Sequence, residues 1–299
     1  MKTITTSLLL CIVLMCNTIH AQSVLQYNLS LGDTYTIQQS AEQDITQDMN
    51  GSKHDMRNEI NASYIFTVKA VNDSLITMDF RFDSFKMKST SNLMGELISV
   101  NTKDSISDDD IEGKIFSGLT KSTLTMTMYK NGKIKELSGT EELIMKMVEG
   151  AGDFDEFTKE LMKESMKGEF GNESLVESFE QMTYIYSKDK VSIGDTWTNR
   201  FRGDLSAENV WTLMSMDDTK NTISGKSDVM FNTEEDTITM KLSGTMDSNL
   251  SVNSNTGFID EMTTSSTAKG ISVLKQMNNL EVPTTIISNV SYKITKNVQ

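Results

Sequence analysis

The chain has 299 residues, of which 42 are acidic and 28 are basic, so its formal net charge at neutral pH is −14. This acidity argues against binding to nucleic acid or to an anionic membrane, because both attract a basic protein surface. An acidic surface that maintains solubility is the simpler interpretation. The length is enough for one large domain or two modest ones.

Residues 1–21 have the pattern of a secretory signal peptide. Lys2 supplies a positive charge, an apolar run covers residues 8–15, and Ile19-His20-Ala21 is a plausible cleavage site before Gln22. The apolar run is too short to span a bilayer stably, and no later stretch is long and apolar enough to do so. We therefore expect an exported protein, periplasmic or at the cell surface, without a transmembrane segment in its mature chain.

Cleavage of this signal would remove every thiol. Cys16 raises the alternative of a lipoprotein, but Met15 stands where such a signal has a small residue, so we do not expect a lipid anchor. Both cysteines and His20 leave with the signal, and His54 becomes the only histidine. The mature chain can then form no disulfide, no thiolate metal site and no cysteine nucleophile.

Residues 22–139 read as antiparallel strands, because apolar and polar residues alternate with period two. The first expected strand is Leu25–Leu31. A long hairpin should follow, turning at Asn50-Gly51, with a polar distal half whose tip projects into solvent. A second hairpin turn is expected at Asn131-Gly132.

The periodicity changes to that of amphipathic helices between residues 140 and 183. Ser138 and Glu141 resemble a capping box for the first helix, and Asp153 is expected to begin the second. Such one-sided helices need an apolar surface, and the nearest one is a sheet face. The expected apolar stripes are Leu143–Val148, Phe154–Met166 and Leu175–Met182.

One short motif occurs twice. Gly32-Asp33-Thr34-Tyr35 returns as Gly194-Asp195-Thr196-Trp197, and Val210–Asp218 resembles Tyr64–Asn72. Gly favours a positive φ and Asp can bond its own nearby backbone, so both copies predict a turn without a catalytic role. The repeated order of turn, strand and hairpin indicates an internal duplication of a β-unit.

These patterns predict an α+β fold with two related, mostly antiparallel β-sheet units, half-barrel or sandwich-like. The first unit is expected over residues 22–139 and the second over 184–299. The helical segment 140–183 lies between them and should pack on a sheet face. Whether the units form one sheet or two is left open.

The sequence gives few candidates for catalysis. A Ser-His-Asp triad or a histidine zinc site would need His54, which has no partner histidine and stands among polar residues. We expect it to be a solvated loop histidine. Paired carboxylates of a glycosidase depend on a three-dimensional separation that sequence does not give. No catalytic residue and no cofactor is therefore predicted.

The acidic loop Asp104–Glu112 is the best calcium candidate. Asp108, Asp110 and Glu112 occupy the first, third and fifth places of a loop like that of an EF-hand. The twelfth place, where a bidentate Glu is needed, is Leu119. A solvated acidic loop is favoured, no metal ligand is assigned, and calcium binding stays open.

Methionine is abundant, with 21 residues in the chain. Paired thioethers could bind copper(I), but most pairs fall on faces already predicted to be apolar. Core filling is therefore the favoured interpretation. The pairs are Met126/Met128, Met145/Met147, Met162/Met166 and Met214/Met216.

Several segments together resemble a family of exported Bacteroidota proteins that carries only a domain-of-unknown-function label. The resemblance is carried by Leu25–Tyr35, Asn131–Ile134, Val191–Trp197 and a signal that ends in Ala21-Gln22. It covers nearly the whole mature chain, but the proline that relatives often have before the third segment is absent. The resemblance implies no activity and no functional residues.

The favoured function is a non-enzymatic binding module of the cell envelope, for an apolar small molecule or lipid. A curved sheet covered by helices rich in Met and Phe could hold such a ligand. The alternative is a structural or interaction protein that contacts an envelope partner through the hairpin tip at Asn50-Gly51. An acidic hydrolase is less favoured.

Overall fold

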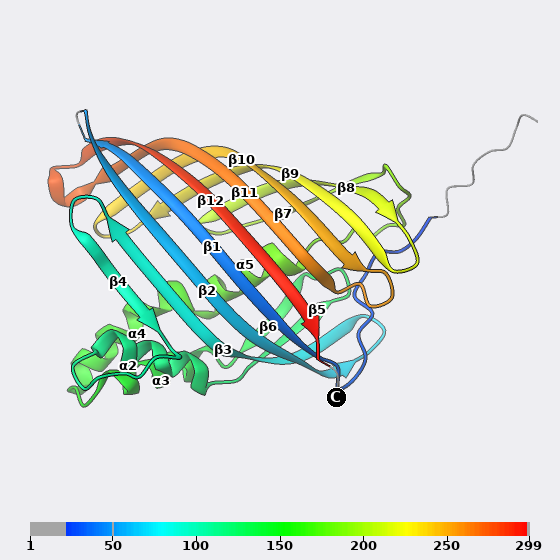
Figure 1. Cartoon of the computed structure of the whole chain (residues 1–299), viewed down its shortest axis with the longest axis horizontal. Helices are drawn as coiled ribbons and strands as arrows, with labels where there is room; N and C mark the ends of the chain where they lie inside the picture. Colours follow the sequence, from blue (N-terminus) through cyan, green and yellow to red (C-terminus); the bar gives the residue numbers. More distant parts are fainter. Residues whose placement is uncertain (1–21, 50, 298–299) are drawn as a thin grey trace, which may run out of the picture.

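The computed structural model describes residues 22–49 and 51–297, and its strands form one twisted antiparallel sheet (Figure 1). The expected signal peptide and Asn50 lie outside the described residues. The strands are β1 (Thr34–Met49), β2 (Ser52–Val71), β3 (Leu75–Ser91), β4 (Gly95–Asn101), β5 (Leu124–Tyr129), β6 (Ile134–Ser138), β7 (Thr196–Phe201), β8 (Leu205–Met216), β9 (Lys220–Glu234), β10 (Ile238–Asn253), β11 (Ile259–Leu274) and β12 (Leu280–Lys296).

The strand order is β6-β5-β3-β2-β1-β12-β11-β10-β9-β8-β7, and β4 pairs with the distal part of β3. β1 and β12, from opposite ends of the described chain, pair from Tyr35 opposite Lys296 to Gln47 opposite Thr284. This pairing joins the strands of the two predicted units into one continuous sheet. The sheet ends at β6 on one side and β7 on the other.

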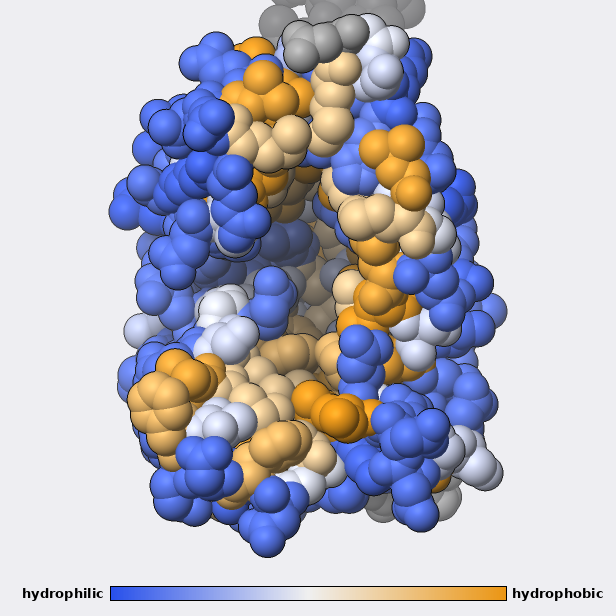
Figure 2. Space-filling model, turned by 90° about the vertical axis from the view of Figure 1, so that its left-hand side faces the viewer, coloured by the Kyte–Doolittle hydropathy of each residue, from blue (hydrophilic) through white to orange (hydrophobic). Residues whose placement is uncertain are grey.

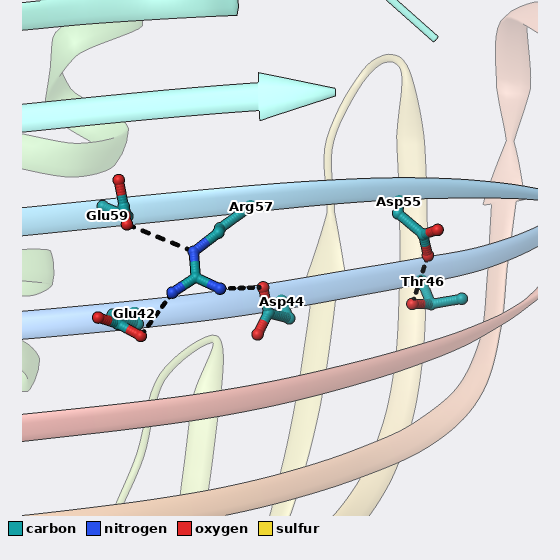
Figure 3. Close-up of polar contacts among 6 residues, drawn as sticks. All are labelled: Glu42, Asp44, Thr46, Asp55, Arg57 and Glu59. Carbon is teal, nitrogen blue, oxygen red and sulfur yellow. Dashed lines mark hydrogen bonds and ion pairs between the residues drawn. The ribbon is translucent and has the colours of Figure 1, made fainter. Parts of the chain in front are cut away.

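The two faces of the curved sheet differ in chemistry. Ile37, Tyr64 and Phe82 are cross-strand neighbours on the inner face, and all three are buried. On the outer face, Arg57 of β2 contacts Glu42 at 2.7 Å and Asp44 at 3.5 Å, both on β1 (Figure 3). Strand alternation thus puts apolar side chains inside and charged ones outside.

Four α-helices are described: α2 (Ile111–Ser117), α3 (Thr140–Ala151), α4 (Glu156–Phe170) and α5 (Asn172–Thr183). The last three confirm the predicted helical segment. None of the described helices is long and apolar enough to cross a bilayer. Two 3-10 turns, η1 (Gly118–Lys121) and η2 (Lys275–Met277), complete the set.

The predicted helix starts were wrong in detail. Ser138 ends β6 and does not cap α3, whose first residue is preceded instead by Gly139 with φ 96°. Asp153 does not begin α4, because Asp155 caps it by accepting a hydrogen bond from the Thr158 amide at 3.0 Å. In both places the preceding strand or helix ends later than the sequence pattern suggests.

Helix α5 spans the space between the two edge strands. The Phe179 ring packs on the inner face of the sheet, 4.8 Å from the Phe80 ring between centroids. The Glu180 carboxylate accepts from the Ile134 amide of β6 at 2.9 Å. Just after the helix, the Ile185 carbonyl accepts from the Trp197 indole of β7 at 2.7 Å. Both sheet edges are thereby tied to one segment.

The predicted strand Leu25–Leu31 is not a strand, although its alternation is real. Leu25, Tyr27 and Leu29 are buried, while Leu31 is exposed. The segment crosses one end of the sheet, where the Tyr27 hydroxyl donates to the Thr183 carbonyl at 3.0 Å. Only Ser23 forms a β-bridge, to Val191. An extended segment that covers an end of the sheet buries every second side chain, just as a strand within the sheet does.

The two Gly-Asp turns have the same conformation. Gly32 has φ 86° and Gly194 has φ 91°, so each glycine occupies the left-handed region that other residues rarely adopt. The aromatic residues that follow, Tyr35 and Trp197, are both buried. Equivalent hydrogen bonds are Ser30 N to Asp33 Oδ2 (3.1 Å) with Ser192 N to Asp195 Oδ2 (2.8 Å), and Gly32 N to Val68 O (2.9 Å) with Gly194 N to Leu213 O (2.8 Å).

Candidate ligand cavity

A cavity of about 390 Å³ lies between the inner face of the sheet and helices α4 and α5. It belongs to the end of the molecule that carries the β1–β2 and β3–β4 turns and helix α4 (Figure 1). Figure 2 looks onto this end and shows a deep hollow with hydrophobic residues in and around it.

The cavity wall is built from inward strand positions and from helix stripes. Met87 of β3 and Ile60 of β2 are cross-strand neighbours on the sheet side. On the helix side, the Phe116 ring lies between two others, 5.3 Å from Phe85 and 6.2 Å from Phe170 between centroids. The inward side chains of the strands and the apolar side chains of the helices thus line one apolar space.

Three polar residues on the sheet side form what we call the polar cluster: Gln39 on β1, Tyr64 on β2 and Tyr292 on β12. Gln39 is opposite Tyr292 in the register, and the Tyr64 hydroxyl donates to the Gln39 Oε1 at 2.7 Å. The Tyr292 hydroxyl has no hydrogen-bond partner among the residues that the structure describes. Burial raises the pKa of Tyr292 to about 12, so its hydroxyl stays neutral near pH 7.

Glu169 is the only charged residue that lines the cavity, within the described chain. Its side chain is exposed near the opening. Loss of solvent around the carboxyl raises its pKa, and the nearby Glu235 and Asp204 raise it further. No lysine, arginine or histidine is part of the described lining.

A second polar row crosses the inner face toward the hairpin tips. The Asn58 amide donates to Gln43 Oε1 at 3.1 Å, and the Ser89 hydroxyl donates to Asn58 Oδ1 at 2.7 Å. Asn58 is thereby bonded through both its NH₂ group and its carbonyl oxygen. These side chains do not line the apolar cavity, so this row is the weaker candidate for recognising a ligand.

His54 is not the solvated loop histidine that the sequence predicted. It lies on β2, is only 8 % exposed, and its Nε2 is 2.9 Å from the Ser91 hydroxyl. The residue opposite is Gln47, which also points inward and is buried. No described carboxylate forms an ion pair with His54, so it has no acidic partner for a triad. The hairpin is paired almost to its tip, and this pairing buries the ring.

Several large apolar side chains are exposed on elements at this end of the molecule, and we call them the rim (Figure 1). Leu93 and Met94 occupy the β3–β4 turn, Phe157 and Leu161 lie on α4, and Met277 ends η2. All five are exposed, with Phe157 73 % exposed. The predicted burial of the second helical stripe is therefore only partly right: Phe157 and Leu161 are exposed, whereas Met166 is half-buried and packs against the core.

A larger, polar cleft of about 1110 Å³ lies between β6, α5 and β7. It contains side chains of both signs, including Lys133 and Glu177, and Arg200 pairs with Glu208 at 2.9 Å. Burial raises the pKa of the Glu177 carboxyl, and the nearby Glu173 adds to this shift. The cleft forms because α5 lies between the edge strands β6 and β7. Its side chains carry both charges, so they favour no single class of ligand.

The acidic loop is used in local structure. Asp110 caps α2 by accepting from the Gly113 amide at 2.7 Å, and Lys114 donates to the Asp108 carbonyl. Within the described residues, no three His, Asp or Glu side chains are placed to hold a metal ion. Of the methionines, Met126 and Met128 are in the core as predicted, whereas Met145, Met214 and others are exposed.

Comparison with solved structures finds a similar fold in lipovitellin, in a structure on lipid–protein interactions. The TM-score is 0.51 at 9% sequence identity, over 91% of this chain and 26% of the lipovitellin chain. The chain thus spans about a quarter of that protein, and the likeness is one of fold alone. An outer membrane channel from Pseudomonas putida F1 (TM-score 0.26, 8% identity, 90% of this chain and 98% of the channel) resembles it far less.

No curated protein matches this sequence. A family model does match, over residues 73–259, which is more than half of the chain. The protein therefore belongs to a family of unknown function, DUF6263.

Proposed function

For this member of a family of unknown function, we propose non-enzymatic binding of an apolar or amphiphilic molecule, such as a lipid, in the cavity beneath α5. The observation that carries the proposal is the lining: aliphatic and aromatic walls, the polar cluster on the sheet side, and Glu169 and Ser178 on the helix side. Ligand sites commonly have this composition, at volumes of about 300–1,000 Å³. Protein interiors otherwise keep few voids larger than a water molecule.

The fold offers secondary support. Lipovitellin, whose solved structure concerns lipid–protein interactions, shares the arrangement of the sheet. Since fold does not imply function, this is an analogy, and the lining of this chain's own cavity carries more weight. A non-catalytic role fits the polar cluster, where Gln39 and Tyr64 bond each other without an activating base.

We place the protein in the cell envelope, as an exported protein, on the sequence pattern of residues 1–21. The rim would then meet apolar molecules released there. We also propose that the two halves of the sheet descend from a duplicated β-unit, with the matching hydrogen bonds of the two Gly-Asp turns as support.

The test is native mass spectrometry and organic extraction of the protein purified from its own host. We expect a bound apolar molecule in the natural protein. Leu175→Trp should exclude it, because Leu175 is buried, lines the cavity, and would be replaced by a larger ring that occupies part of the space. The matched control is Ser165→Trp, since Ser165 is exposed on α4 and is not in the lining.

Absence of any bound molecule from the natural protein would contradict the proposal. It would favour the alternative, an interaction protein with its contact at the β1–β2 tip. Gly51, Ser52 and Lys53 are exposed there, while Asn50 lies outside the described residues.

A further inference from the structure

We infer that the cavity selects amphiphiles by the charge of their head group: it takes an uncharged head that both donates and accepts hydrogen bonds, and rejects the same chain with an anionic head. This inference rests on the proposed function and names the class of ligand. Fatty alcohols, amides and monoacylglycerols have the required chemistry.

The polar cluster has free hydrogen-bonding capacity in one place. Because Tyr64 donates to Gln39 Oε1, the carbonyl of that amide is occupied while its NH₂ group keeps its donors. The neighbouring Tyr292 hydroxyl can donate and accept, and it has no partner within the described chain. An alcohol or amide head could bond both groups at once.

The cluster is surrounded by apolar groups, which makes these free groups significant. Ile60 and Phe82 line the same side of the cavity, and Met182 faces them from α5. Gln39 and Tyr292 are half-buried, so a ligand head that bonds their free groups replaces water there, whereas a head that cannot form these bonds is disfavoured. The chain of the ligand would then lie against the aromatic wall.

Among the described residues of the lining, none would neutralise an anionic head. The lining residues within the described chain include no cation, and their one charge is the Glu169 carboxylate. Lys275, which ends near Glu235 at the rim, already bonds the Glu235 carbonyl at 2.6 Å and lies 3.8 Å from Glu234. An anion would thus lose its hydration without gaining a countercharge.

A cationic head is not favoured either. Glu169, Glu235 and Asp204 are exposed residues, and of these three only Glu169 lines the cavity. The polar cluster, in contrast, lies on the sheet side and offers only neutral groups. The chemistry of the innermost polar groups therefore determines the preferred head.

The experiment uses the full mature chain after removal of lipid, loaded with the neutral dye Nile red. Displacement is compared at pH 7.5 for hexadecan-1-ol, hexadecanamide, hexadecanoate and hexadecyltrimethylammonium, all below micelle-forming concentration. We expect the alcohol and amide to bind about 10-fold or more tightly than either charged compound. Equal or tighter binding of hexadecanoate or of the ammonium compound would overturn the inference while leaving the proposed function intact. Displacement by none of the four would overturn the proposed function itself.

Two substitutions separate recognition from packing. Gln39→Lys places a cation in the cavity and should reverse the preference, so that hexadecanoate binds at least about 10-fold more tightly than the alcohol. Gln38→Lys is the matched control, since Gln38 is exposed on the outer face and its change should leave the order unaltered. An unreversed preference in Gln39→Lys, with Nile red still bound, would contradict the placement of the head.

Tyr292→Phe tests the unpartnered hydroxyl. We expect it to weaken hexadecan-1-ol about 10-fold and to leave hexadecane, which has no head, unchanged. Equal weakening of both ligands would show that Tyr292 acts through packing alone, and would overturn its assignment as the hydrogen-bonding group.

Discussion

Phe179→Ala gives the sharpest test of how α5 is held in place. The Phe179 side chain is 7 % exposed and packs against three rings, with centroid distances of 4.8 Å to Phe80, 5.7 Å to Tyr64 and 6.0 Å to Phe66. Truncating a buried Phe costs about 3–5 kcal/mol of unfolding free energy. We expect about 3 kcal/mol here, because the ring already borders a cavity.

Guanidinium chloride unfolding of the mature chain measures this loss. For an m-value of about 6 kcal/mol/M, the midpoint should fall by about 0.5 M while m stays constant. Phe157→Ala is the control, since Phe157 is 73 % exposed on α4 and its loss should change stability by about 0.5 kcal/mol or less. Equal midpoints for the two variants would refute the assigned packing of α4 and α5.

Three further predictions follow from local contacts. Gly132→Ala should destabilise the fold by at least about 2 kcal/mol, because the new Cβ would lie 1.6 Å from a backbone carbonyl oxygen. Gly51→Ala is the comparison: its new Cβ would have no atom within 4 Å, so it should cost only about 1–2 kcal/mol in the same unfolding assay. Burial acts to raise the pKa of the Asp33 carboxyl, but hydrogen bonds and the lysine beside it outweigh burial and lower the pKa overall. Asp33→Asn should therefore reduce the free energy of unfolding at pH 7. Measured against pH, the difference between the natural protein and the variant should vanish as the pH falls through the lowered pKa. A difference that stays constant with pH would count against the ion pair. Asp110→Ala removes the α2 cap and should lower the free energy of unfolding by about 1 kcal/mol. Calorimetric titration of the natural protein with millimolar calcium should give no heat. Heat that is seen with the natural protein and disappears in the variant would instead assign a calcium site.

Local pattern was enough to predict the secondary structure in most places. Alternation placed Phe66 and Met126 on buried strand faces, and Leu143 and Phe179, from the first and third helical stripes, are buried as expected. These positions obey the periods of strand and helix, which depend only on backbone geometry. The turn at Asn131-Gly132 also follows from local chemistry, since Gly132 has φ 91°.

Errors arose where tertiary contacts decide. Leu25 and Tyr27 alternate like a strand but cover an end of the sheet, and Phe157 continues an apolar stripe but remains exposed at the rim. His54 is buried because its hairpin pairs with neighbouring strands as far as Ser91. The hydrophobic period of a segment does not say which strand it pairs with, or whether the residues of a hairpin are buried by neighbouring strands.

The polar cluster depends on the longest-range pairing in the fold. Gln39 and Tyr292 meet only because β1 pairs with β12. One member of the cluster could be noticed in the sequence, since Gln39 is a polar residue in the inward series of β1 between Ile37 and Ala41. Gln43 and Gln47 in the same series are polar too, so an inward polar residue alone does not locate the cavity.

Photolabelling tests the central claim most directly. The probe is a hexadecan-1-ol that carries a diazirine near the end of its chain, and the labelled peptides are identified by mass spectrometry. Binding in the cavity predicts labels on the segment from Phe170 to Met182 and on the strand that carries Ile98, with competition by unlabelled alcohol. Labels confined to the outer face of the sheet, or unaffected by competition, would contradict it.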